Sequence, residues 1–160
     1  MGIRKRESGF SVVEMIMVLC LLAFMTAVGG YGFWQLMPRY RLNGAVQSIV
    51  SDFQLARMKA IGQNCSYRIR ILPGENQYFL EKESSTETTR WPGVPEGIIR
   101  KFSASNTPYY YPGVELETSS NHPVFSPRGT VVGTTVVLKN SSGQRKITLS
   151  SLGRVKVQEG

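Results

Sequence analysis

One carboxylate stands at the edge of the most apolar part of the sequence, and its chemistry constrains the whole chain. Glu14 directly precedes a run from Met15 to Pro38 that contains no charged side chain. A carboxylate in a membrane segment costs about 2.5 to 3.5 kcal/mol at the centre of the bilayer, and less toward its edge. A buried carboxylate is tolerated when an opposite charge and hydrogen bonds accompany it. The sequence therefore predicts that a positive group compensates Glu14.

The segment that follows Glu14 has the length and the flank of a membrane helix. The uncharged run from Met15 to Pro38 exceeds the roughly 20 apolar residues that cross a bilayer as a helix. Its N-terminal side carries Arg4, Lys5 and Arg6, and the positive-inside rule keeps such a flank in the cytoplasm. We therefore expect a single membrane crossing, with the C-terminal part of the chain exported.

Two ordinary kinds of N-terminal segment also match this pattern. One is an uncleaved signal anchor that tethers an exported domain. The other is a secretory signal sequence, in which the small residues Ala27, Gly29 and Gly30 offer a cleavage site. Both are disfavoured by Glu14, because neither gives a reason for a charge at that position.

The residues around Glu14 resemble the cleavage site of type IV prepilins. The match consists of Gly9-Phe10-Ser11-Val12-Val13-Glu14 followed by Met15-Ile16-Met17-Val18-Leu19. The resemblance implies that a prepilin peptidase removes residues 1–9, cutting between Gly9 and Phe10, and N-methylates Phe10. It also implies that Glu14, then the fifth residue of the mature chain, pairs with the terminal amine of a neighbouring subunit in a filament.

A helical pattern continues beyond the apolar run. Apolar residues recur every three or four positions, at Leu42, Val46, Ile49, Phe53, Ala56 and Ala60. This spacing places them on one face of a helix, and the polar residues that suit its other faces are Arg41, Gln47, Asp52 and Lys59. We expect one helix from about Ser11 to about Ile61, interrupted or bent near Gly29-Gly30 and Pro38, with Gly62 as its stop.

The remainder of the chain has the patterns of β-strands. The expected strands are 67–72, 77–83, 98–102, 114–118, 134–138, 146–149 and 154–157. Turn sequences lie between several of them, namely Pro73-Gly74-Glu75-Asn76, Ser141-Ser142-Gly143 and Leu152-Gly153. Residues 84–95 and 103–112 are expected to be exposed loops. Since the amphipathic half of the helix needs a local partner, we predict an α+β fold in which it packs on sheets.

The exported part resembles the GspH/FimT group of minor pseudopilins and minor pilins. Three segments carry the resemblance: Leu55-Ala56-Arg57-Met58-Lys59-Ala60-Ile61, Val124-Phe125-Ser126-Pro127-Arg128-Gly129-Thr130 and Ile147-Thr148-Leu149-Ser150-Ser151-Leu152-Gly153-Arg154-Val155. It implies a pilin-like fold, a long N-terminal helix whose first half spans the membrane, packed on antiparallel β-sheets. The expected parts are a leader peptide at 1–9, a transmembrane and assembly helix at 10–38, its amphipathic second half at 39–62 and a β-rich globular domain at 63–160.

No set of residues in the sequence fits catalysis, a metal ion or a cofactor. His122 is the single histidine, and no cysteine or carboxylate flanks it at ligand spacing. The glycines of the C-terminal half do not form a phosphate-binding loop ahead of a helix. Cys20 lies in the apolar run and Cys65 in the polar part, so we expect no disulfide between them. We therefore expect no enzymatic activity, no metal and no cofactor.

Positive charge is the remaining feature of the exported part. The chain carries 19 Lys and Arg against 11 Asp and Glu, and the basic residues near its end are Arg145, Lys146, Arg154 and Lys156. A basic strand surface binds phosphates in a salt-dependent way. Gly153-Arg154-Val155-Lys156 resembles the Gly-Arg-x-Arg ending of FimT-type minor pilins that take up DNA. A solvated basic face is the alternative, and the lysine favours it, because lysine binds phosphate only as a point charge.

Four functions fit these features. The first is a minor pilin near the tip of a type IV pilus, where it helps to initiate assembly. The second is a minor pseudopilin of a type II secretion system, and the third is a DNA-binding minor pilin. All three imply other pilins or pseudopilins and the prepilin peptidase as partners, a single pass through the bacterial inner membrane and a periplasmic domain that enters a pilus or pseudopilus. The fourth is a tethered adhesin that never polymerises, with Tyr109-Tyr110-Tyr111 as its contact surface.

Overall fold

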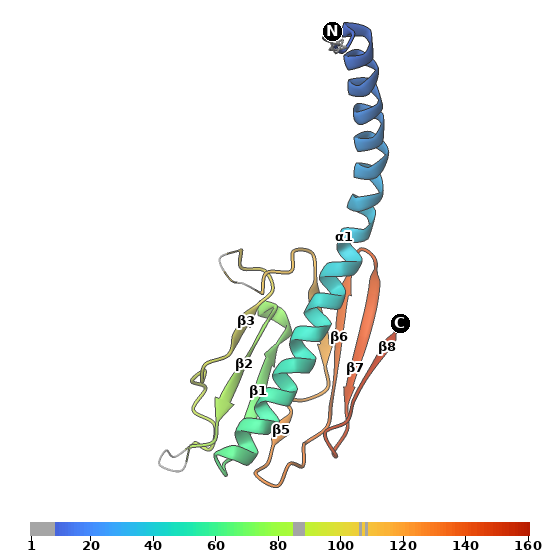
Figure 1. Cartoon of the computed structure of the whole chain (residues 1–160). Coiled ribbons are helices and arrows are strands. Elements are labelled where there is room, and N and C mark those ends of the chain that lie inside the picture. The colour runs from blue at the N-terminus through green and yellow to red at the C-terminus, as the bar shows by residue number, and fades with distance from the viewer. Residues whose placement is uncertain (1–8, 85–88, 106, 108) are drawn as a thin grey trace, which may run out of the picture. The chain divides into compact units, whose positions relative to one another are not determined.

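The computed structural model describes residues 9–84, 89–105, 107 and 109–160, which form one long helix followed by short strands. The elements are α1 (Val12–Gly62), β1 (Tyr67–Leu72), the short 3-10 helix η1 (Pro73–Glu75), β2 (Gln77–Lys82), β3 (Ile99–Lys101), β4 (Glu115–Ser119), β5 (Val124–Phe125), β6 (Thr134–Asn140), β7 (Gly143–Leu149) and β8 (Val155–Glu159) (Figure 1). The chain divides into two compact units, one that ends at Met37 and one that runs from Pro38 to Gly160.

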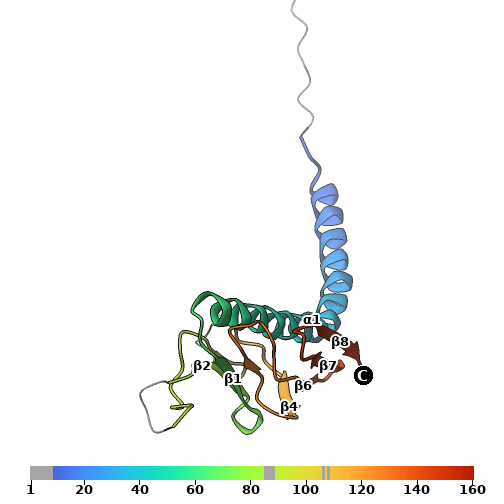
Figure 2. The same ribbon diagram turned by 90° about the horizontal axis from the view of Figure 1, so that it is seen from below.

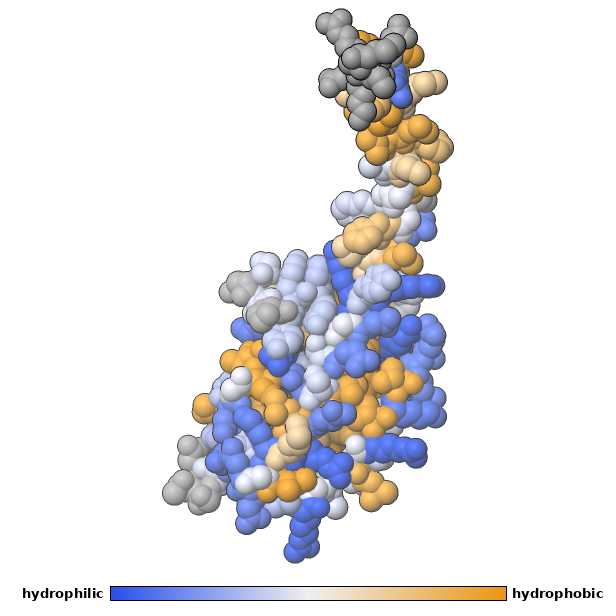
Figure 3. Space-filling view, viewed as in Figure 1, coloured by the Kyte–Doolittle hydropathy of each residue, from blue (hydrophilic) through white to orange (hydrophobic). Residues whose placement is uncertain are grey.

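The first unit is the apolar half of α1, and its side chains are exposed. Figure 3 shows hydrophobic side chains around this half of the helix, and Phe24 is 69% exposed. Among the described residues, α1 is the one helix that is long and apolar enough to cross a membrane by length and composition. The helix is continuous through Gly29, Gly30 and Pro38, so the predicted interruption is wrong, while a bend at these residues stays a prediction. A proline inside a helix loses one hydrogen bond and crowds the preceding turn, at about 3 kcal/mol, and a glycine costs about 1 kcal/mol, which a long helix tolerates.

From Pro38 onward, α1 buries one stripe of side chains against the strands. All six apolar residues predicted for this face are buried, and Ala45 joins them: Leu42, Ala45, Val46, Ile49, Phe53, Ala56 and Ala60. Figure 2 shows this half of α1 as one layer and the strands as the other. The α+β fold predicted from the helical and strand patterns is therefore confirmed.

The strands form two antiparallel sheets. The first sheet has the order β3-β2-β1-β5 and the second has the order β4-β6-β7-β8. All seven predicted strands are present, with ends that differ by a few residues. The structure adds β5, which pairs Phe125 with Tyr67 at the edge of the first sheet. Two residues are too few to show the alternation that identifies a strand in a sequence.

Two asparagines in the left-handed conformation shape the turns of this unit. Asn64 (φ 50°) follows the end of α1, so Gly62 ends the helix without supplying the left-handed residue itself. Asn76 (φ 51°) closes the β1–β2 turn. Its side chain donates to the Val114 carbonyl at 2.8 Å and accepts from the Leu116 amide at 2.9 Å. The turn of the first sheet is thereby tied to β4 of the second.

Asp52 was predicted to lie on a polar face of α1 away from the core, but this prediction is wrong, because Asp52 is only 3% exposed. Tyr78 donates its hydroxyl hydrogen to Asp52 Oδ2 at 2.8 Å. The guanidinium of Arg100 donates to both carboxylate oxygens, from Nε at 2.9 Å and from Nη2 at 3.1 Å. Burial, followed by the charge of Asp52, raises the pKa of Tyr78 well above its ordinary value. The partners lie in β2 and β3, far along the chain, which is why the helical pattern alone misplaced Asp52.

The tyrosine run considered as an adhesive surface folds back largely onto its own domain. Tyr111 is half-buried, packs edge-on against Phe102 at 5.7 Å and shares a hydrogen bond of 2.8 Å with Ser48. Tyr109 lies under the guanidinium of Arg100, 3.4 Å from ring centre to Cζ. Only Tyr110 is exposed. The three rings therefore do not form a continuous exposed surface.

The buried ion pair predicts a large loss of stability in Arg100→Met. The substitution leaves the Asp52 carboxylate buried without its ionic partner, and breaking such a pair costs about 3 to 5 kcal/mol of unfolding free energy. Chemical denaturation of the full chain in detergent micelles, followed by circular dichroism, measures this loss. The control is Arg90→Met, which removes the ion pair between Arg90, 63% exposed, and Glu83, and should cost less than about 1 kcal/mol. Equal losses in the two variants would contradict a structural role for the Asp52–Arg100 pair.

Candidate functional site

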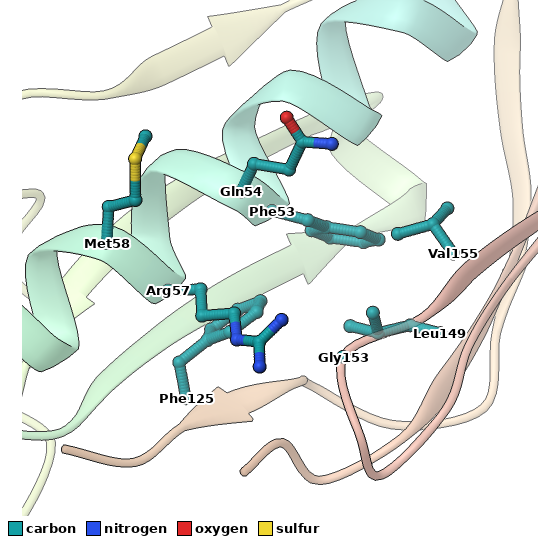
Figure 4. A pocket seen from close by; sticks show the side chains of 8 residues that line it. All are labelled: Phe53, Gln54, Arg57, Met58, Phe125, Leu149, Gly153 and Val155. Carbon is teal, nitrogen blue, oxygen red and sulfur yellow. The ribbon is translucent and has the colours of Figure 1, made fainter. Parts of the chain in front are cut away.

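Three of the sequence segments singled out above meet at one place in the structure. They are the C-terminal part of α1, the segment that contains β5, and the β7–β8 hairpin. Together they line a cavity of about 340 Å³ (Figure 4). Its lining residues are Phe53, Gln54, Arg57, Met58, Phe125, Leu149, Gly153 and Val155.

The floor of this cavity is apolar and its wall on the helix side carries polar groups. Phe53, Phe125 and Leu149 are buried, and the two phenylalanine rings pack at 6.1 Å between centres. Figure 4 shows Phe53 and Val155 pointing toward each other and the guanidinium of Arg57 beside Phe125. The arrangement suits an apolar side chain that is accompanied by an anionic group.

The side chain of Arg57 lies close to two tight turns, each of which contains a glycine. A Cβ atom on Gly153 would lie 2.8 Å from Nη1 of Arg57, and one on Gly129 would lie 3.5 Å from Nη2. Both glycines have a φ of +79°, which side-chain-bearing residues rarely adopt. Each closes a turn through its amide, Gly129 to the Ser126 carbonyl at 3.0 Å and Gly153 to the Ser150 carbonyl at 2.9 Å. The two glycines are thus required by conformation, and the missing Cβ of Gly153 leaves room for the end of the Arg57 side chain.

The guanidinium of Arg57 is half-buried and has no hydrogen bond or ion pair with the part of the chain that the structure describes. The neighbours of the two glycines, Arg128 and Arg154, are exposed and likewise lack an ionic partner within the described ranges. Sequence analysis missed Arg57, because a single arginine on a helix gives no sign that two distant turns enclose it. Arg57 therefore gives the cavity one unpaired positive charge, while Arg128 and Arg154 are not among its lining residues.

The four basic residues predicted to bind DNA do not gather in one cluster. Arg145 forms an ion pair with Glu159 across the β7–β8 ladder. Lys146 and Lys156 are exposed and share the sheet face opposite to the buried Ile147 and Leu149. Arg154 lies in the β7–β8 turn beside the cavity. The structure therefore brings two of the four together on one face and separates the others.

The residues predicted for processing and assembly lie at the start of α1. Gly9 and Phe10 precede the helix and Phe10 is 80% exposed, while Glu14 lies in the first turn. An acidic side chain there is favoured by the helix dipole. Residues 1–8 of the predicted leader, with Arg4, Lys5 and Arg6, lie outside the described residues. Glu14 forms no ion pair within the described chain, so its role in assembly stays a prediction.

His122 has a structural contact in the first sheet. Its Nδ1 accepts a hydrogen bond from the Ile71 amide at 3.2 Å. Burial, followed by the charges of Arg68 and Arg70, lowers the pKa of the imidazole below its ordinary value. Cys20 and Cys65 are free thiols, and no three potential ligands among His, Cys, Asp and Glu lie together within the described ranges.

Comparison with known proteins finds similar folds in a minor pseudopilin and a minor pilin. The family model described as type II transport protein GspH matches residues 45–153. The minor pseudopilin EpsH from the type 2 secretion system of Vibrio cholerae is 14% identical, with a TM-score of 0.55 over 74% of this chain and 97% of that chain. The type IV minor pilin FimU of Pseudomonas aeruginosa is 18% identical, with a TM-score of 0.54 over 75% of this chain and 90% of that chain. None of the curated proteins matches the chain by sequence.

The positive φ of Gly153 predicts that Gly153→Ala destabilises the protein to the same degree as Gly113→Ala. The two glycines have φ values of +79° and +80°, and a Cβ added at such a φ costs roughly 1 to 2 kcal/mol in backbone strain. A Cβ on Gly113 meets nothing within 4 Å, while one on Gly153 meets the flexible end of Arg57, which can move aside. Thermal unfolding of the two variants measures both losses. A much larger loss in Gly153→Ala would show that Arg57 is fixed in the space beside Gly153.

The lowered pKa of His122 predicts acid-dependent stability. The unfolded chain takes up a proton near the ordinary pKa of 6.5, while the folded chain resists it until a lower pH. The contribution of His122 to stability is therefore complete above about pH 6.5 and is lost as the pH falls from there through the lower pKa of the folded chain. Unfolding free energies measured across this range should decrease in the wild type as the pH is lowered, and should decrease less steeply in His122→Asn. Identical slopes in the two proteins would contradict the environment described for His122.

Proposed function

The chain belongs to the GspH family of type II transport proteins, and from this premise we propose that it is a minor subunit of a type IV pilus-like filament. In this proposal it is built in near the filament tip and helps to initiate assembly. The family consists of structural pilin and pseudopilin components rather than enzymes. We accordingly propose a role in assembly and no catalytic activity.

The observation that carries the proposal is the uncovered apolar half of α1, which begins at a carboxylate. Side chains such as Leu19 and Phe24 are 62% and 69% exposed and have no cover in a single copy of the chain. Lipid covers such a surface before assembly, and neighbouring helices cover it in a filament. A positive group on a neighbouring subunit then offsets the cost of burying Glu14, which also favours one axial register of the subunits over others.

Processing supplies that positive group. We propose that the prepilin peptidase cuts between Gly9 and Phe10 and methylates the new terminal amine of Phe10, as the prepilin-like residues imply. Before assembly the chain then crosses the inner membrane once, and the unit from Pro38 to Gly160 lies in the periplasm. Its partners are other pilins or pseudopilins of the same filament.

A minor pseudopilin of a type II secretion system is the second candidate function. The description of the matching family favours it, while the folds of EpsH and FimU fit both candidate functions. Both functions use the same subunit chemistry. DNA binding stays a prediction without structural support, since Arg145 is ion-paired and only Lys146 and Lys156 share a face.

Deletion of the gene tests the proposal. Surface pili counted by electron microscopy should disappear and return with the wild-type gene or with Glu117→Ala, a control that removes an exposed carboxylate from β4. Glu14→Ala should restore few or none, although equal amounts of protein are present. Pili that persist in the deletion strain would overturn the pilus proposal and favour the secretion system. Full restoration by Glu14→Ala would overturn the assembly role of that residue.

Mass spectrometry of the mature N-terminus tests the processing step. We expect N-methylated Phe10 in the wild type and an intact leader in a strain that lacks the prepilin peptidase. A leader that remains on the wild-type protein would contradict filament assembly and favour a tethered protein that does not polymerise.

A further inference from the structure

β8 is an edge strand with free hydrogen-bonding groups. It pairs only with β7 among the residues that the structure describes. The Ser150 amide donates to the Arg154 carbonyl at 2.9 Å, and the Gly160 amide donates to the Gln144 carbonyl at 3.3 Å. Because the direction of these groups alternates along an antiparallel strand, the amides and carbonyls of Val155, Val157 and Glu159 point away from β7. They can pair with a further strand.

The free edge adjoins the cavity described above. Val155 belongs to both, since its side chain lines the cavity and its main-chain groups lie on the free edge. The surface around them is apolar, with Val157 45% exposed, Met58 62% exposed and Leu152 78% exposed. An extended segment added to β8 can therefore bury apolar side chains as it makes main-chain hydrogen bonds.

The charges near this end of β8 favour an acidic occupant. Arg57 in the cavity wall and Arg154 just ahead of β8 have no carboxylate partner within the described ranges. A guanidinium forms its strongest contacts with a carboxylate or a phosphate. The apolar floor of Phe53, Phe125 and Leu149 suits a hydrophobic side chain next to the anion, which a protein segment supplies and a phosphate backbone does not.

We propose that β8 and this cavity bind an extended, acidic and apolar segment of a neighbouring subunit. The segment adds as a strand to the free edge of β8, places an apolar side chain in the cavity and sets a carboxylate against Arg57. This proposal names a contact for the filament subunit described above and rests on that function.

Peptide binding to the full chain in detergent micelles tests the proposal. The probe is a short fluorescein-labelled peptide in which every second residue is threonine and the residues between them are alternately valine and glutamate, so that one strand face carries both. Its matched control carries lysine in place of glutamate. Fluorescence anisotropy should show binding of the acidic peptide and at least about tenfold weaker binding of the basic one. Absence of binding by the acidic peptide, or equal binding of the two, would overturn the proposal.

Two substitutions at Val157 separate strand addition from charge alone. Val157→Pro removes one outward amide and leaves the pairing with β7 intact, because a proline is tolerated on an edge strand when its nitrogen faces outward. It should abolish binding, whereas Val157→Thr, which keeps the amide, should bind like the wild type. Equal binding by the two variants, at equal unfolding temperatures, would overturn strand addition.

Arg57→Gln gives a test that does not depend on the folding of the proline variant. It should weaken binding of the acidic peptide about tenfold, and unchanged binding would overturn the assigned role of Arg57. Binding of duplex DNA that Arg57→Gln abolishes and Val157→Pro leaves intact would point to a phosphate site and overturn the proposal. Pilus counts in the deletion strain report separately on the proposed function, so that either proposal can fail while the other stands.

Discussion

Burial of one stripe of α1 on two separate sheets holds the unit from Pro38 to Gly160 together. Ala45, Ala56 and Ala60 are fully buried, and their small side chains let the helix approach the strands closely. Ile69 of β1 and Val136 of β6 belong to the same core, although the two strands lie in different sheets. The sheets therefore depend on the helix for their shared core, and the side chain of Asn76 adds a direct link between them.

Hydrophobic burial sets which face of a helix meets a sheet, and directional polar contacts fix its axial position more sharply. The carboxylate of Asp52 meets both nitrogen donors of Arg100 in β3, and such two-point contacts tolerate little displacement. We infer that this ion pair sets the register of α1, while the apolar stripe supplies most of the stability.

Local sequence patterns predicted much of the fold, and the features that they missed depend on contacts between residues far apart in the chain. The spacing from Leu42 to Ala60 predicted the buried face of α1, because helical period and burial are both local properties. Asp52, Arg57 and β5 were missed for a common reason, since each is defined by partners far along the chain. The sequence also did not predict that three motif segments line one cavity, because these segments lie far apart in the chain. The roles of Gly9, Phe10 and Glu14 stay predictions, because the partners expected for them are not part of this chain.

The order of the strands along the chain has a consequence for how the unit folds. β6, β7 and β8 follow one another as hairpins, so their contacts are local and require little loop closure. β1 instead pairs with β5, which is synthesised after β2, β3 and β4. The helix is synthesised before all of them, and its apolar stripe is covered only in part until the strands of the second sheet are made. During biosynthesis this stripe is therefore a transient target for chaperones, and premature termination before β6 leaves it permanently uncovered along the second sheet.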